Sequence, residues 1–182
     1  EVPTEDIDGS HGDIHKEGNP HYWLNPMNGI IIAKDIRDHL VVIDPKNKSF
    51  YDQNFNEFSK KITDKMTIWK KEMAKVQKTE FVTYHKVWAY FFEAFELSDA
   101  GTLELFPGVP PTIKHLKQLK DNLVKQNQDV IILMANFYPK NIGQSFSKGV
   151  NAKFRHISTN VGDPGIASYT NLFDHLVMEI TK

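Results

Sequence analysis

The stretch of sequence that decides the fold is KSFYDQNFNEFSKKITDKMTIWKKEMAKVQKTEFVTY, residues 48–84. Its apolar residues follow one another at spacings of 3, 4, 4, 3, 4 and 3: Phe55, Phe58, Ile62, Met66, Trp69, Met73 and Val76. This spacing puts them in one stripe along a helix, and it predicts a long amphipathic helix over residues 48–78. A coiled coil would carry a similar stripe, but the chain offers no partner segment, so packing within the molecule is favoured.

Downstream of this helix, strand patterns alternate with helix patterns. We expect strands at 80–84, 103–106, 129–134 and 152–157, and helices at 87–95, from 112 onward, at 139–147 and at 168–180. Strands that alternate with helices predict a parallel sheet with helices on both faces. The apolar run DVIILM, residues 129–134, is typical of a strand that is buried on both faces. The fold class is therefore α/β, and residues 80–182 are expected to form a lobe with four parallel strands.

Upstream of the long helix, residues 1–20 are polar and without period, which indicates a loop. Asn25-Pro26 predicts the start of a helix, because Asn caps the first turn and Pro suits the first helical position. This helix is expected to end near Leu40, before Asp44-Pro45. The sequence begins at Glu1 without an initiator Met, so we expect a processed or trimmed product.

Composition excludes several classes of function. Lys and Arg number 22 against 23 Asp and Glu, and this balance argues against a nucleic-acid binder, which usually shows a basic excess. The sequence has no apolar run near the roughly 20 residues that span a bilayer. It has no cysteine, which rules out disulfides and thiolate ligands but fits oxidising and reducing compartments equally.

Three short connections each carry one candidate metal ligand: His21 in GNPHYWLNP, His85 in TYHKVW and Asp163 in VGDPG. Two neutral imidazoles and a carboxylate suit a borderline divalent ion such as zinc. His85 directly follows a predicted strand and Asp163 follows another, at the sheet edge where open α/β folds bind ligands. Taken singly, each residue also has a structural explanation, because a histidine among aromatics often serves packing and Asp-Pro-Gly is a common turn.

The other histidines give weaker signals. His11 and His15 lie in the predicted polar N-terminal loop. They could bind a metal ion there, or they could simply be solvated. A set of four, His39, His115, His156 and His175, falls within predicted helices or a strand. The sequence contains no nucleophile elbow, phosphate loop, dinucleotide fingerprint or HExxH motif, so nothing indicates an enzyme.

Taken in order, the segments GNPHYWLNP, the long helix, TYHKVWAYF, LFPGVPPTIKHLKQL and VGDPGIASYTNLFDHLV resemble the zinc and manganese solute-binding proteins of bacterial ABC importers. The resemblance covers about residues 18–180 and implies two lobes with parallel sheets, joined by a long helix, with the metal between them. It implies that His21, His85 and Asp163 are ligands, with His15 as a further candidate. A histidine at position 85, where other members carry glutamate, resembles the zinc type. Zn²⁺ is therefore expected, with Mn²⁺ as the alternative.

The resemblance also implies a domain organisation and a set of partners. Members of the family carry a longer segment before the His21 motif, so the first lobe is expected to be only partly present. Residues 1–47 would be its remainder, residues 48–79 the linking helix and residues 80–182 the second lobe. The implied function is capture of a divalent metal in the periplasm, or by a membrane-anchored lipoprotein, and delivery to the permease of an ABC importer.

Two alternatives and one consequence stay open. An adhesin or host-factor binder on the same scaffold would use the metal structurally. A metal-dependent hydrolase would need a hydroxide-bearing coordination position and a base, and neither is visible. An incomplete first lobe would expose apolar surface and favour self-association.

Overall fold

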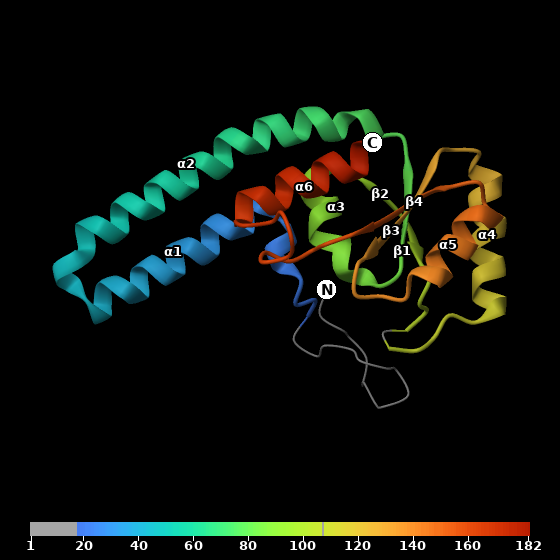
Figure 1. Cartoon of the computed structure of the whole chain (residues 1–182), viewed down its shortest axis with the longest axis horizontal. Coiled ribbons are helices and arrows are strands. Elements are labelled where there is room, and N and C mark those ends of the chain that lie inside the picture. Colours follow the sequence, from blue (N-terminus) through green and yellow to red (C-terminus); the bar gives the residue numbers. More distant parts are fainter. Residues whose placement is uncertain (1–17, 107) are drawn as a thin grey trace.

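The computed structural model describes residues 18–106 and 108–182; His11 and His15 lie outside this part of the chain. Two long helices, α1 (Pro26–Ile43) and α2 (Lys48–Met73), lie side by side and extend away from an α/β body (Figure 1). A short 3-10 turn, Pro45–Asn47, joins them. Asn25 caps α1 by accepting a hydrogen bond from the Met27 amide, as the Asn-Pro pair predicts.

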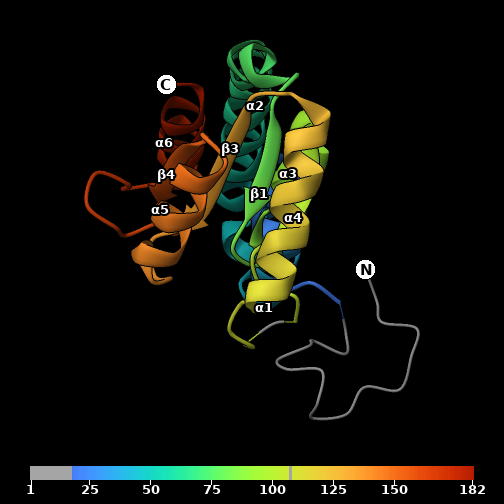
Figure 2. The ribbon, with the colours of Figure 1, turned by 90° about the vertical axis from the view of Figure 1, so that its right-hand side faces the viewer.

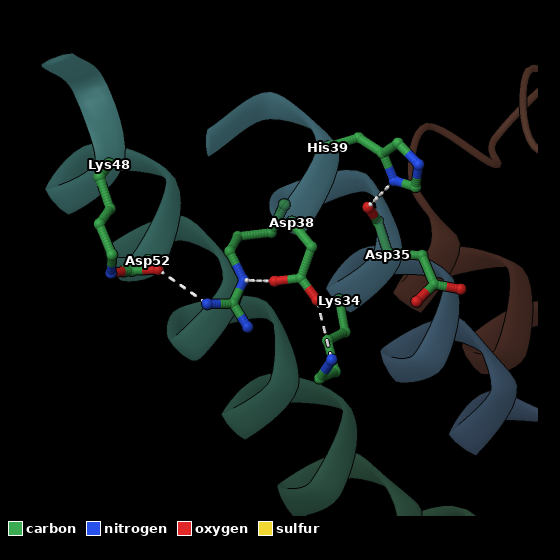
Figure 3. Close-up of polar contacts among 7 residues, drawn as sticks. Lys34, Asp35, Asp38, His39, Lys48 and Asp52 are labelled. Carbon is green, nitrogen blue, oxygen red and sulfur yellow. Dashed lines mark hydrogen bonds and ion pairs between the residues drawn. The ribbon is translucent and has the colours of Figure 1, made fainter. Parts of the chain in front are cut away.

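Polar contacts hold the two helices of this hairpin together at its outer end (Figure 3). Arg37 on α1 pairs with Asp52 on α2 at 3.0 Å and with Asp38 on its own helix at 3.0 Å. Its guanidinium also lies over the Phe55 ring, 5.1 Å from the centroid. Exposed ion pairs contribute little individually, but Arg37 is mostly covered and links both helices.

The predicted apolar stripe of α2 faces the body of the protein. Ile62, Trp69 and Met73 are fully buried against α6 (Tyr169–Thr181) and the sheet. Trp69 donates its indole N–H to Asp174 Oδ1 at 2.8 Å, and Lys65 pairs with the same carboxylate at 2.9 Å. The helix ends at Met73 and a 3-10 turn, Ala74–Val76, continues it toward the sheet.

The sheet has four strands in the order β2-β1-β3-β4, and all neighbouring pairs are parallel, which confirms the predicted parallel sheet. The strands are β1 (Glu80–Thr83), β2 (Ser98–Thr102), β3 (Val130–Ala135) and β4 (Lys153–Ile157). Every residue of the two central strands is buried. This explains the unbroken apolar run of β3, because a central strand buries both faces.

Helices cover both faces of the sheet. Phe81, Ile131 and Leu133 point into one core with α2, α6 and α3 (Ala89–Phe95). Alternate residues of the same strands, including Val82 and Ile132, point into a second core. That core is closed by α4 (Ile113–Gln126) and α5 (Lys140–Gly149), which lie in front of the sheet in Figure 2 with α2 behind it.

One predicted strand is misplaced. We expected a strand at 103–106, but β2 occupies Ser98–Thr102 and pairs with β1 at the edge of the sheet. An edge strand needs only backbone hydrogen bonds, so a polar segment with a glycine, Ser-Asp-Ala-Gly-Thr, can serve. The apolar pattern after it comes from Leu103, which is fully buried. Among the described residues, no helix combines the length and apolarity that a membrane span requires.

Candidate metal centre

The carboxyl edge of the sheet gathers polar side chains from all four strands. His85 and Glu104 each lie two residues beyond the end of a strand, β1 and β2, while Asn136 and Ser158 directly follow β3 and β4. They reach one edge because the four strands are parallel.

His21 and His85 come together although they belong to distant segments. Their ring centroids are 5.8 Å apart and the ring planes meet at 73°. Two imidazoles on one tetrahedral zinc ion place their centroids about 5 Å apart, given nitrogen–zinc bonds of about 2.0–2.1 Å. The separation of the two rings is therefore close to that of two histidine ligands on one ion.

Asn19 connects the two histidine segments. Its Nδ2 donates to the Lys86 carbonyl at 2.7 Å, which turns its Oδ1 toward His21. Oδ1 then accepts from the His21 amide at 3.0 Å and lies 2.8 Å from His21 Nδ1. Because an amide oxygen only accepts, this contact places the ring hydrogen of His21 on Nδ1. The Tyr90 hydroxyl also donates to the Asn19 carbonyl, at 3.2 Å.

His85 has a buried carboxylate as its partner. Its Nδ1 lies 3.0 Å from Glu104 Oε2, and the two side chains are only 14% and 7% exposed. Burial raises the pKa of Glu104, and the facing His85 acts against this rise. Burial and Glu104 together raise the pKa of Tyr84 as well.

Sequence reasoning missed Glu104, because the strand expected at 103–106 would have placed it inside the sheet. The usable signal was the position of Glu104. It follows β2, and β2 is the neighbour of β1, the strand that precedes His85. This position depends on the end of β2 at Thr102, which places Glu104 beyond the strand.

Asp163 lies at the same edge of the sheet, beyond β4. Its Oδ2 accepts hydrogen bonds from the Ser158 hydroxyl and, at 3.1 Å, from Asn136 Nδ2. These two donors hold the pKa of Asp163 below its usual range. It borders a cavity of about 350 Å³ that His156, His175 and Glu179 also line.

The connection that carries Asp163 is a closed turn. The Ile166 amide donates to the Asp163 carbonyl at 2.9 Å, and Gly162 and Gly165 adopt positive φ angles. Within residues 18–106 and 108–182, no three His, Asp or Glu side chains already converge as a metal cluster. The structure thus brings His21 and His85 together but does not join Asp163 to them, and the ligand set remains a prediction.

Three other histidines contact backbone carbonyls. His39 Nδ1 lies 2.7 Å from the Asp35 carbonyl on α1, His115 Nε2 lies 2.7 Å from that of Thr102, and His156 Nε2 lies 3.0 Å from that of Tyr138. The first of these contacts is drawn in Figure 3. These contacts fit structural roles for the three rings.

The solved structures that share this fold include ZnuA and a periplasmic metal binding protein. A crystal structure of ZnuA has a TM-score of 0.77 at 21% identity, covering 96% of this chain and 68% of that one. The Cd-bound periplasmic metal binding protein of candidatus Liberibacter asiaticus has a TM-score of 0.75 at 21% identity, covering 94% of this chain and 68% of that one. At these identities the likeness establishes the fold.

Curated relatives include zinc and manganese transport proteins. The high-affinity zinc uptake system protein ZnuA of Bacillus subtilis (strain 168) is 26% identical over 144 residues, 79% of this chain and 45% of that protein. The metal ABC transporter substrate-binding lipoprotein SloC of Streptococcus mutans is 36% identical over 112 residues, 58% of this chain and 37% of that protein. The manganese ABC transporter substrate-binding lipoprotein PsaA of Streptococcus pneumoniae is 35% identical over 107 residues, 58% of this chain and 35% of that protein.

The parallel α/β body with its long helical hairpin shares the fold of these solved structures. The model of the family described as zinc-uptake complex component A, periplasmic (ZnuA), matches residues 2–182, so the chain belongs to that family. The chain spans between 35% and 45% of the length of the three curated relatives above.

Proposed function

We propose that this chain captures a divalent transition metal outside the cytoplasm for delivery to an ABC importer, and that zinc is the favoured ion. The observation that carries the proposal is the His21–His85 pair, with ring centroids 5.8 Å apart. The metal is cargo, so it must be bound reversibly. Imidazole nitrogen suits zinc, whereas manganese prefers oxygen ligands, and Mn²⁺ is the alternative.

A carboxylate completes the proposed ligand set. Asp163 is the candidate, because it lies at the carboxyl edge of the same sheet and is held ionised by its hydrogen-bond donors. Both of these donors contact Oδ2 of its carboxylate. His15 is a further candidate from the N-terminal segment.

The partner follows from the relatives. SloC and PsaA are named as substrate-binding lipoproteins of metal ABC transporters. For this chain we propose the same kind of partner, a membrane permease, and a periplasmic or membrane-anchored location. The names of these relatives describe transport and not catalysis, and none of them favours the adhesin alternative.

Zinc titration by calorimetry at pH 7.5 tests the proposal. We expect His21→Ala and His85→Ala each to weaken zinc binding at least tenfold. The matched control is His39→Ala. This exposed histidine of α1 lies with its Nδ1 2.7 Å from the Asp35 carbonyl, and its replacement should leave zinc affinity unchanged. If both site variants bind zinc as well as the parent chain does, the site lies elsewhere and the proposal fails.

A further inference from the structure

We propose that Glu104 is a positioning residue that fixes the His85 ring so that Nε2, and not Nδ1, is presented to the metal. This inference rests on the proposed function. Glu104 does not touch the ion in this scheme. It acts through the hydrogen bond that joins Oε2 to His85 Nδ1 at 3.0 Å.

Backbone hydrogen bonds hold the two residues in register. The segment after β2 runs beside the segment after β1, because the Leu103 amide donates to the Thr83 carbonyl at 2.7 Å and the Glu104 amide donates to the Tyr84 carbonyl at 3.0 Å. The separation of Glu104 and His85 is therefore set by the sheet and not by mobile side chains. This rigidity is what a positioning residue requires.

Burial leaves the His85 ring little freedom to rotate. The His85 side chain is 14% exposed, and its ring centroid lies 5.8 Å from that of His21 and 6.2 Å from that of Tyr138. Glu104 is 7% exposed, and its carboxylate has the Tyr84 hydroxyl as a second hydrogen-bond partner beside His85. The neutral His85 ring satisfies it only as the tautomer with hydrogen on Nδ1, which leaves the Nε2 lone pair for an ion.

The carboxylate also changes the strength of the ligand. A carboxylate on the far nitrogen of a metal-bound histidine makes that histidine a better donor, and its loss commonly costs about 10–100-fold in metal affinity. At His21 the corresponding nitrogen faces an amide oxygen, that of Asn19. The two histidines thus have different hydrogen-bond acceptors: the neutral amide of Asn19 at His21 and the carboxylate of Glu104 at His85.

The experiment uses two readouts on the whole chain at pH 7.5. Nitrogen-15 NMR of the imidazoles in the metal-free protein reports the His85 tautomer, with the His85 signals assigned by their loss in His85→Ala. Zinc calorimetry reports affinity. In the parent we expect the Nδ1–H tautomer of His85.

Three variants separate positioning from simple stability. Glu104→Leu should give a mixed tautomer and about 10–100-fold weaker zinc binding. Glu104→Gln keeps an oxygen acceptor of the same length, so it should retain the tautomer and restore part of the affinity. Glu93→Gln, an exposed glutamate on α3, is the control and should change neither readout. If Glu104→Leu does not fold, the His85 tautomer of the parent still decides, because an Nε2–H ring could not donate from Nδ1 to Glu104 and would overturn the proposal.

The outcomes distinguish this inference from the proposed function. An Nε2–H tautomer in the parent, or unchanged tautomer and affinity in Glu104→Leu, overturns the role of Glu104 even if His85 binds zinc. If Glu104→Leu shifts the tautomer but neither His21→Ala nor His85→Ala weakens zinc binding, the proposed function fails and the metal role of Glu104 fails with it.

Discussion

At the scale of single residues, Tyr169 ties the C-terminal helix to the segment that carries His21. Its hydroxyl donates to the Trp23 carbonyl at 2.6 Å and lies 3.1 Å from the Asn25 carbonyl. Burial raises the pKa of Tyr169 well above its usual range, so the hydroxyl stays protonated and able to donate. Its ring fills the space beside Gly29, where any Cβ would overlap it. One side chain of α6 thus contacts both α1 and the turn that follows His21, and it limits how closely they pack against α6.

Tyr169→Phe should therefore destabilise the protein by about 1–3 kcal/mol, because the Trp23 carbonyl loses its hydrogen-bond donor. Urea unfolding followed by circular dichroism measures this loss. Tyr22→Phe is the control, since Tyr22 is exposed and its hydroxyl should contribute little. Equal stability of the two variants would show that water replaces the Tyr169 hydroxyl at no cost.

The pH dependence of zinc binding should come from the histidines and not from Asp163. The pKa of Asp163 is lowered from the ordinary range near pH 4, so its carboxylate is ionised at every pH above that range. The stabilisation from its hydrogen bonds is lost only as pH falls through the lowered pKa. An ordinary imidazole, with a pKa near 6.5, gains its proton between pH 7.5 and 5.5 and can no longer bind the ion.

We therefore expect zinc affinity to fall about 10–100-fold from pH 7.5 to pH 5.5 in the parent, with a similar ratio in Asp163→Asn and a smaller one in His85→Ala. Calorimetry at the two pH values measures these ratios. Equal parental affinity at both would mean that the imidazoles are not ligands.

At the scale of elements, α2 depends on its buried stripe. Ile62 is fully buried, whereas Ile68, on the same helix, is 55% exposed. Ile62→Ala should cost about 2–5 kcal/mol, because it removes buried methyl groups and leaves a cavity. Ile68→Ala should stay within about 0.5 kcal/mol of the parent. Denaturant unfolding compares the two variants, and a cost within noise for Ile62→Ala would mean that α2 does not pack as described.

The contact between α5 and the sheet depends on Gly143. A Cβ at this position would overlap the Met134 sulfur and the Phe154 ring, so Gly143→Ala must displace these side chains or α5 itself. We expect a loss of about 1–3 kcal/mol, the usual cost of overpacking. Gly149→Ala is the matched control at the end of the same helix, where a Cβ meets only Lys120 Nζ at 3.8 Å. That variant should be neutral or slightly stabilising, since alanine favours helix more than glycine does. Thermal unfolding of both variants tests this prediction, and equal stability of Gly143→Ala and Gly149→Ala would contradict it.

At the scale of the whole molecule, α1 leaves several large apolar side chains exposed. Ile31, Ile36, Val42 and Ile43 are each more than half exposed. Large exposed apolar patches favour association, so the self-association expected from the sequence remains a prediction. Sedimentation velocity over a range of protein concentrations should show a concentration-dependent shift toward dimer in the parent, and Ile31→Ser with Ile36→Ser should remove it. A monomer at every concentration would contradict the prediction.

The division of the chain into a first-lobe remainder (1–47), a linking helix (48–79) and a second lobe (80–182) also remains a prediction. The helices and strands within these ranges are those described above. The assignment to lobes awaits a test such as separate expression of residues 80–182.

The sequence by itself determined the features that depend on local periodicity. The 3- and 4-residue spacing around Ile62 and Trp69 predicted α2, and the alternation of strands and helices predicted the parallel sheet. The position of His85 after β1 could be predicted because it requires only the end of one buried strand. Local patterns suffice for these features, since side-chain period and burial are set within each element.

Only the tertiary structure decided the features that depend on the meeting of distant segments. β2 is a polar edge strand that pairs through its backbone, so its side chains carried no strand signal. The contact of Glu104 with His85 follows from the register of that strand, and the contacts of Asn19 with His21 and Lys86 follow from the docking of the His21 segment on the body. Register and docking arise from the packing of the whole chain, which is why the partners of the two histidines could not be predicted from the residues around them.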